Sequence, residues 1–171
     1  VFRSTELWAY VGISVAAVGL ICANIYSSCQ NFAEAVRLSA FQVSSIITTT
    51  GYSTADFNLW PTFSKTILLL LMLIGACAGS TAGGMKVSRV VIIFKNIRKQ
   101  IKALLHPRSV NAVKFEGKTV GDETLKSVNS YLGIYCLCLA GFFFVLSFDS
   151  FGDIETNLSA TVACFNNIGP G

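Results

Sequence analysis

Residues 48–54 read TTTGYST, a polar turn containing a glycine that follows the half-apolar segment 32–47. This preceding segment is too short to cross a bilayer, which takes about 20 apolar residues, and it contains Glu34 and Arg37. We therefore expect it to be a re-entrant helix that ends at membrane depth. Non-helical backbone is tolerated there only where protein buries it or where it lines a water-filled cavity. The sequence thus predicts that residues 48–54 border a pore.

Two long apolar segments show that the bilayer is the solvent of this chain. Residues 7–26 and 128–148 contain no charged side chain, and at about 1.5 Å per residue each is long enough to cross a hydrocarbon core of about 30 Å. The composition, with 53% hydrophobic and 13% charged residues, also excludes an ordinary soluble domain. Both segments are predicted transmembrane helices.

The same order of segments occurs twice along the chain. In the second copy, the span at 128–148 is followed by a short helix predicted at 154–165 and by NNIGPG, residues 166–171. Each turn contains glycine, which supplies backbone conformations that other residues avoid. Internal repetition of this kind is typical of membrane transport proteins. It predicts an all-α membrane protein built from helix, re-entrant loop and helix repeats.

The two turns are the candidate ion-binding sites. TTTGY resembles the selectivity filter of potassium channels, in which backbone carbonyls replace the hydration shell of the ion, although a Thr-rich loop alone is also an ordinary surface feature. A helix that ends just before such a turn directs the negative end of its dipole at a cation. In the second turn we expect mainly backbone ligands, with the Asn side chains as support. The predicted potassium-binding residues are Thr49, Thr50, Gly51, Tyr52, Asn166, Asn167, Ile168 and Gly169.

A further apolar segment is interrupted in its middle. Residues 66–74 and 90–94 are apolar, but residues 75–86 between them read GACAGSTAGGMK. Glycine costs about 1 kcal/mol at each position of a helix interior, so we expect this helix to unwind within the membrane. Close helix packing through small residues and a substrate site of a secondary transporter are the alternatives. The residues of interest here are Gly75, Gly79, Ser80, Thr81, Gly83, Gly84 and Lys86.

Charge is distributed unevenly along the chain. Ten of the 13 Lys and Arg residues lie between residues 86 and 126, and the positive-inside rule places residues 95–126 in the cytoplasm. Nucleic-acid binding is a poorer explanation, because few aromatic residues alternate with these charges. The opposite face then holds acidic side chains that would concentrate cations. These acidic residues are Asp56, Asp149, Asp153 and Glu155.

The remaining reactive side chains show no arrangement for catalysis or metal binding. The six cysteines have no CxxC spacing, and His106 has no cysteine or carboxylate at ligand spacing. Residues 75–86 also fail the GxxxxGK[ST] pattern of a phosphate-binding loop. We therefore predict neither an enzyme nor a protein with a bound cofactor.

Taken in order, the motifs TTTGYS, GSTAGGMKVSR, HPRSV and NNIGPG resemble the second half of potassium uptake subunits of the TrkH/KtrB type. The resemblance implies four repeats around one pore, with potassium as the substrate. Residues 1–104 would be the third repeat, 105–126 a cytoplasmic loop, and 127–171 the fourth repeat up to its filter, so the chain would be a fragment of the C-terminal half.

The same resemblance implies roles and partners. Gly51 and Gly169 would be filter glycines, and residues 75–84 would form an intramembrane gate below the filter. It further implies a multi-pass protein of the bacterial inner membrane, surrounded by lipid. Such a protein would form a homodimer and bind a cytosolic nucleotide-binding regulatory subunit.

Overall fold

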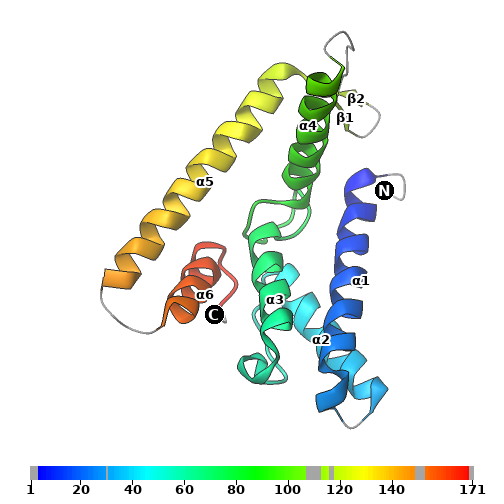
Figure 1. Ribbon diagram of the computed structural model, residues 1–171, viewed down its shortest axis with the longest axis vertical. Helices are drawn as coiled ribbons and strands as arrows, with labels where there is room; N and C mark the ends of the chain where they lie inside the picture. Colours follow the sequence, from blue (N-terminus) through cyan, green and yellow to red (C-terminus); the bar gives the residue numbers. More distant parts are fainter. Residues whose placement is uncertain (1–3, 30, 107–112, 116–117, 149–152, 170–171) are drawn as a thin grey trace.

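The computed structural model describes residues 4–29, 31–106, 113–115, 118–148 and 153–169 (Figure 1). These residues are mostly helical, as the sequence predicts. The helices are α1 (Thr5–Ile25), α2 (Phe32–Ile47), α3 (Thr62–Ile74), α4 (Val87–Leu105), α5 (Asp122–Phe148) and α6 (Ile154–Phe165). Two short 3-10 turns occur at Tyr26–Ser28 and Phe57–Leu59.

A small hairpin departs from the all-α expectation. β1 (Lys114–Phe115) and β2 (Lys118–Thr119) pair antiparallel within the loop that precedes α5. The HPRSV motif lies almost entirely outside the described residues, which resume at Val113. Two strands of two residues are a local feature of this loop and leave the helical architecture unchanged.

Among the described helices, α1 and α5 are long and apolar enough to cross a membrane. Ser4 caps α1, because its hydroxyl oxygen accepts a hydrogen bond from the amide of Leu7. α5 begins at Asp122, earlier than the span predicted from residue 128. Acidic residues in a first helical turn interact favourably with the helix dipole, and Asp122 and Glu123 supply them here. The loop before α5 is correspondingly shorter than predicted.

The two short helices have the bounds expected from the sequence. α2 covers residues 32–47 and α6 covers residues 154–165. At about 1.5 Å per residue, both are shorter than a hydrocarbon core of about 30 Å. Each of them packs against α3, and α2 also contacts α1 while α6 contacts α5. The turns after α2 and α6 are therefore held near one common helix.

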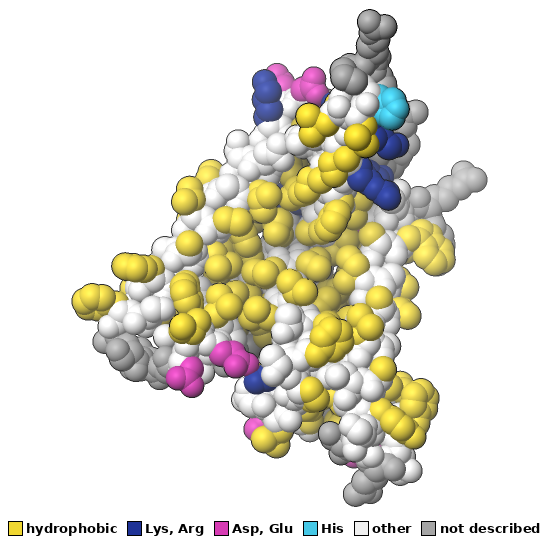
Figure 2. All heavy atoms as spheres, viewed as in Figure 1, with side chains coloured by type: hydrophobic (Ala, Val, Ile, Leu, Met, Phe, Trp, Pro, Cys, Tyr) yellow, Lys and Arg dark blue, Asp and Glu magenta, His cyan; other side chains and the backbone are white. Residues whose placement is uncertain are grey.

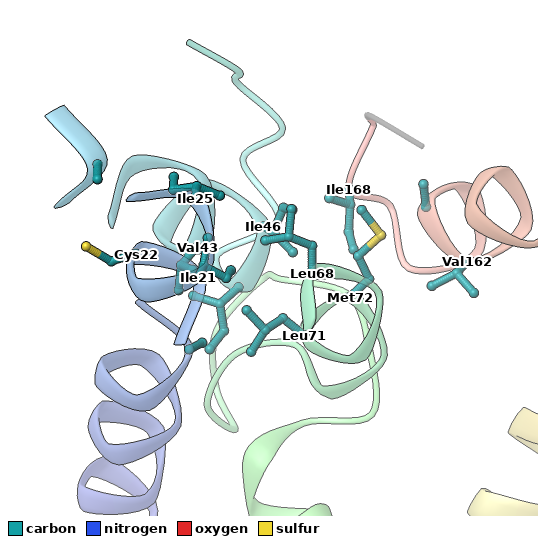
Figure 3. Close-up of a cluster of buried hydrophobic side chains, with 14 residues drawn as sticks. Ile21, Cys22, Ile25, Val43, Ile46, Leu68, Leu71, Met72, Val162 and Ile168 are labelled. Atoms are coloured by element: carbon teal, nitrogen blue, oxygen red, sulfur yellow. The ribbon is translucent and has the colours of Figure 1, made fainter. Parts of the chain in front are cut away.

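The larger of two clusters of buried apolar side chains among the described residues joins both halves of the chain (Figure 3). In a bilayer, such packing stabilises through van der Waals contact rather than through removal of apolar surface from water. Polar contacts help: Ser64 of α3 donates a hydrogen bond to the side-chain oxygen of Asn24 of α1 at 2.8 Å. The core residues labelled in Figure 3 are Ile21, Cys22, Ile25, Val43, Ile46, Leu68, Leu71, Met72, Val162 and Ile168.

Charged side chains gather toward the two ends of the face in Figure 2, and hydrophobic ones cover its middle. At one end, Lys99 of α4 pairs with Asp122 of α5 at 3.9 Å. At the other, Lys65 of α3 pairs with Glu155 of α6 at 2.7 Å. Asp149, one of the acidic residues placed on this second side, lies outside the described residues. The two ion pairs connect neighbouring helices outside the apolar middle.

Candidate functional site

The first turn begins where α2 ends in a Schellman motif. Thr49 adopts a left-handed conformation with φ of 55°. Its amide donates to the carbonyl of Ile46 at 3.0 Å, and the amide of Thr50 donates to the carbonyl of Ser45 at 2.9 Å. These are the two hydrogen bonds that define this helix ending. Gly51 follows with φ of 80°, so the chain leaves the helix axis abruptly.

The second turn repeats this geometry with a different sequence. Asn167, with φ of 54°, takes the place of Thr49. Its amide donates to the carbonyl of Cys164 at 3.1 Å, and the amide of Ile168 donates to the carbonyl of Ala163 at 2.9 Å. Gly169 then has φ of 105°. The two turns, which share little sequence, are therefore the same backbone structure.

Both turns leave consecutive carbonyl groups available. The Schellman hydrogen bonds use the carbonyls of the last helical turn. Within the described part of the chain, nothing donates a hydrogen bond to the carbonyls of Thr49, Thr50 and Gly51 or to those of residues 167–169. Free carbonyl oxygens that follow the negative end of a helix dipole are suited to cation binding.

Tyr52 differs from the other residues predicted in the first turn. Its carbonyl accepts a hydrogen bond from the hydroxyl of Ser45 at 2.6 Å, and its side chain is largely exposed. This bond ties the end of the turn back to α2. Ser45 holds the first turn at two points, because its carbonyl also accepts from the amide of Thr50.

The side chains at the middle of each turn are anchored differently. In the first turn, the hydroxyls of Thr48 and Thr50 lie 2.7 Å apart and form a hydrogen bond. In the second turn, Ile168 replaces Thr50 and is 3% exposed within the apolar core. A polar anchor and an apolar one thus support the same backbone path.

The predicted interruption between α3 and α4 is confirmed. α3 ends at Ile74 and α4 begins at Val87. The neck between them is closed by backbone hydrogen bonds: the amide of Met85 donates to the carbonyl of Leu73 at 3.1 Å, and that of Lys86 donates to Ile74 at 2.9 Å. Residues 75–86, called the loop from here on, therefore leave and rejoin one helical path, as in compact Ω-loops.

Two charged side chains hold the loop in place. The ammonium group of Lys86 donates to the carbonyl of Ser80 at 2.8 Å, to the hydroxyl of Ser80 at 3.2 Å and to the carbonyl of Ala82. From α1, a carboxylate oxygen of Glu6 accepts a hydrogen bond from the amide of Ala78 at 2.5 Å. Hydrogen bonds to charged groups are stronger than neutral ones, so these contacts favour one loop conformation.

The loop touches the second turn through glycine. A Cβ atom on Gly83 would collide with the carbonyl oxygen of Asn166, and one on Gly75 would collide with the carbonyl oxygen of Gly83. Gly79 has φ of 86°, but the space around it is open. The structure thus brings Gly75, Gly83 and Asn166 together, whereas Gly79 and Thr81 lie on the exposed side of the loop.

The sequence did not draw attention to Glu6 and Tyr135, which support these elements, or to Gln42, whose polar side chain is buried. Glu6 directly precedes the first predicted span and Tyr135 lies within the second, and the Tyr135 hydroxyl donates to the Asn166 side chain at 2.8 Å. Gln42 of α2 is 1% exposed, and its side chain has no hydrogen-bond partner among the described residues. A polar side chain within an apolar segment or at its border is the signal that could have drawn attention to each of them.

Two helices of membrane-spanning length and two short helices that end in glycine-containing turns are an arrangement expected of a membrane protein. The family model described as "TrkH: Cation transport protein" matches residues 13–171. The chain therefore belongs to the TrkH family of cation transport proteins, which are membrane proteins and not enzymes.

Individual relatives agree with this assignment. The Trk system potassium uptake protein TrkG of Escherichia coli K12 is 40% identical over 78% of this chain and 27% of its own length. TrkH of the same strain is 31% identical over 99% of the chain and 35% of its own length. The crystal structure of the potassium transporter TrkH from Vibrio parahaemolyticus matches with a TM-score of 0.92 and 31% identity, over 99% of this chain and 36% of that one. The chain thus spans about a third of the length of the proteins it matches.

Proposed function

We propose that this chain supplies two of the filter turns of a potassium-conducting pore. The observation that supports this best is the shared backbone of the two turns: each follows a short helix, reverses in a Schellman motif and leaves three consecutive carbonyls without a donor among the described residues. Such carbonyls replace the hydration shell of a potassium ion. The relatives are named as potassium uptake proteins, which makes potassium the substrate to test.

The loop between α3 and α4 is the proposed gate. It contacts Asn166, the residue directly before the free carbonyls of the second turn, through Gly83. It is closed at its neck by backbone hydrogen bonds and held in one arrangement by Lys86 and Glu6. An irregular segment of this kind at membrane depth must face protein or water, and a few broken hydrogen bonds are enough to rearrange it. Loops with these properties commonly control access to a site.

Membership of the TrkH family supports a proposal for the wider assembly. Residues 1–104 form the third repeat and residues 127–171 the fourth up to its filter, with residues 105–126 in the cytoplasm. The complete protein lies in the bacterial inner membrane among lipids, forms a homodimer and binds a cytosolic nucleotide-binding regulatory subunit. Potassium passes through as substrate, and no cofactor takes part.

Residues 1–171 alone should not conduct. In the proposed pore, four filter turns coordinate the ion, and the two turns of this chain cannot surround it. Potassium flux into liposomes containing only this chain should therefore equal that of protein-free liposomes. The full-length protein, reconstituted at the same protein-to-lipid ratio, is the positive control. Potassium-selective flux through residues 1–171 alone would contradict the proposal that four repeats are needed.

Lys86→Met should raise potassium flux through the full-length protein by about fivefold, the factor that corresponds to about 1 kcal/mol. The methionine keeps the length of the side chain but removes the donors to Ser80 and Ala82, so the closed loop loses its support. The measurement is the rate of potassium uptake by cells lacking other uptake systems, at equal protein amount. Lys102→Met, which removes a charge from the exposed end of α4, should leave the rate unchanged. Equal rates in both variants would argue against Lys86 as a support of the gate.

A further inference from the structure

Asn166 is the residue at which α6, the loop and α5 meet. It caps α6, its carbonyl oxygen lies against Gly83, and it is 1% exposed. It directly precedes the free carbonyls of residues 167–169. Any displacement of Asn166 therefore displaces these carbonyls as well.

Tyr135 of α5 holds the side chain of Asn166. Its hydroxyl donates a hydrogen bond to the side-chain oxygen of Asn166 at 2.8 Å, and Tyr135 is itself 7% exposed. The amide nitrogen of the Asn166 side chain is buried and has no partner among the described residues. Within that part of the chain, the Tyr135 hydroxyl is thus the group that fixes the orientation of this side chain.

Aromatic neighbours restrict the position of the Tyr135 ring and therefore of its hydroxyl group. Its ring contacts Phe165, the last residue of α6, at 5.2 Å between centroids with the planes at 62°. It also stacks on Tyr131, with 6.1 Å between the ring centroids. The Tyr131 ring in turn lies under the guanidinium of Arg89 of α4 at 4.2 Å. Among the described residues of α5, Tyr135 is the buried one with a polar group, since the others are Leu125 and Val128.

We propose that Tyr135 is a positioning residue for the second filter turn. Its hydroxyl holds Asn166, and through Asn166 it keeps the carbonyls of residues 167–169 spaced for potassium rather than for the smaller sodium ion. This inference rests on the function proposed above. The discrimination between potassium and sodium depends on the number, the field strength and the spacing of the coordinating carbonyls. If the second turn loses the hydrogen bond to Tyr135, its carbonyls can move closer together, and sodium should pass more readily.

Tyr135→Phe tests the inference, because it keeps the ring contacts with Phe165 and Tyr131 and removes only the oxygen that reaches Asn166. In the full-length protein, we expect the potassium-to-sodium permeability ratio, measured from reversal potentials, to fall about fivefold, on the scale of one hydrogen bond. Tyr131→Phe is the matched control. It removes a hydroxyl one turn away, leaves the Tyr135–Asn166 bond in place and should keep the ratio of the wild type.

A double-mutant cycle separates positioning from a general structural effect. Asn166→Ala removes the same hydrogen bond from the other partner and should also lower the ratio. If Tyr135 acts through Asn166, adding Tyr135→Phe to Asn166→Ala should cause no further decrease. Independent, multiplying effects of the two substitutions would overturn the inference.

Gly51→Ser, measured in parallel, distinguishes the inference from the function on which it rests. If Gly51→Ser lowers the ratio while Tyr135→Phe keeps it at the wild-type value, the positioning role of Tyr135 is wrong and the filter stands. If neither substitution changes the ratio, the filter assignment itself fails and the inference fails with it. A decrease in both, with Tyr131→Phe unchanged, is the result we expect.

Discussion

Gly51→Ser in the full-length protein should lower the potassium-to-sodium permeability ratio by about tenfold. Gly51 has φ of 80°, and a residue with a Cβ atom costs about 1–2 kcal/mol in a left-handed conformation. A factor of ten corresponds to about 1.4 kcal/mol. The substitution should therefore shift the carbonyls of Thr50 and Gly51 away from the positions that suit a dehydrated potassium ion. Relative permeability from reversal potentials measures the effect.

The control for this experiment is Gly133→Ser on α5. Gly133 is exposed and has open space where a Cβ atom would lie, so the same chemical change should leave the ratio unaltered. Gly169→Ser should act in the same direction as Gly51→Ser, because Gly169 also has a positive φ, of 105°. An unchanged ratio in Gly51→Ser protein that is present in the membrane in normal amount would refute the filter assignment.

Deleting residues 78–82 should raise potassium flux through the full-length protein by about tenfold and leave the permeability ratio near that of the wild type. The deletion removes the amide that Glu6 holds and the oxygens that Lys86 holds, so the closed arrangement loses both supports. The neck can still close, because its hydrogen bonds run between residues 73–76 and 85–87. Flux per folded protein, measured in liposomes, is the quantity to compare.

Thr81→Ala keeps the length of the loop and should have the flux of the wild type. If residues 75–86 serve only to pack helices, the deletion should instead cause misfolding or loss of the protein from the membrane. Wild-type or lower flux from a folded deletion variant would reject the gate. A rise in flux accompanied by a large loss of selectivity would show that the deletion also disturbs the second turn, with which Gly83 is in contact.

Local signals made the helices predictable. α2 ends where apolar residues are followed by Thr and Gly, and α6 ends where they are followed by Asn and Gly. The interruption between α3 and α4 follows from the cost of glycine in a helix. The likeness of the two turns was also visible, although only as a glycine after a short helix. The structure adds that Thr49 and Asn167 share one left-handed conformation, which residue types alone do not specify.

The contacts between distant segments were not predictable in the same way. Glu6 accepts a hydrogen bond from Ala78, and Tyr135 donates one to Asn166. The sequence around Glu6 or Tyr135 does not indicate which distant residue it contacts. The early start of α5 and the hairpin before it were missed because both lie in a polar loop without hydrophobic periodicity. Ser45 lies in the half-apolar segment 32–47, and residue types alone do not indicate that its hydroxyl and carbonyl both hold the first turn.

Locating a bound cation is the most direct test of the central claim that the two turns ligate potassium. Crystals of the full-length protein grown with thallium ions, which substitute for potassium, should show an anomalous difference peak in contact with the carbonyls of Thr50 and Gly51 and with those of Ile168 and Gly169. A well-ordered structure without a peak at these carbonyls, or with its peak only among the oxygens of Ser80 and Ala82 in the loop, would contradict the account.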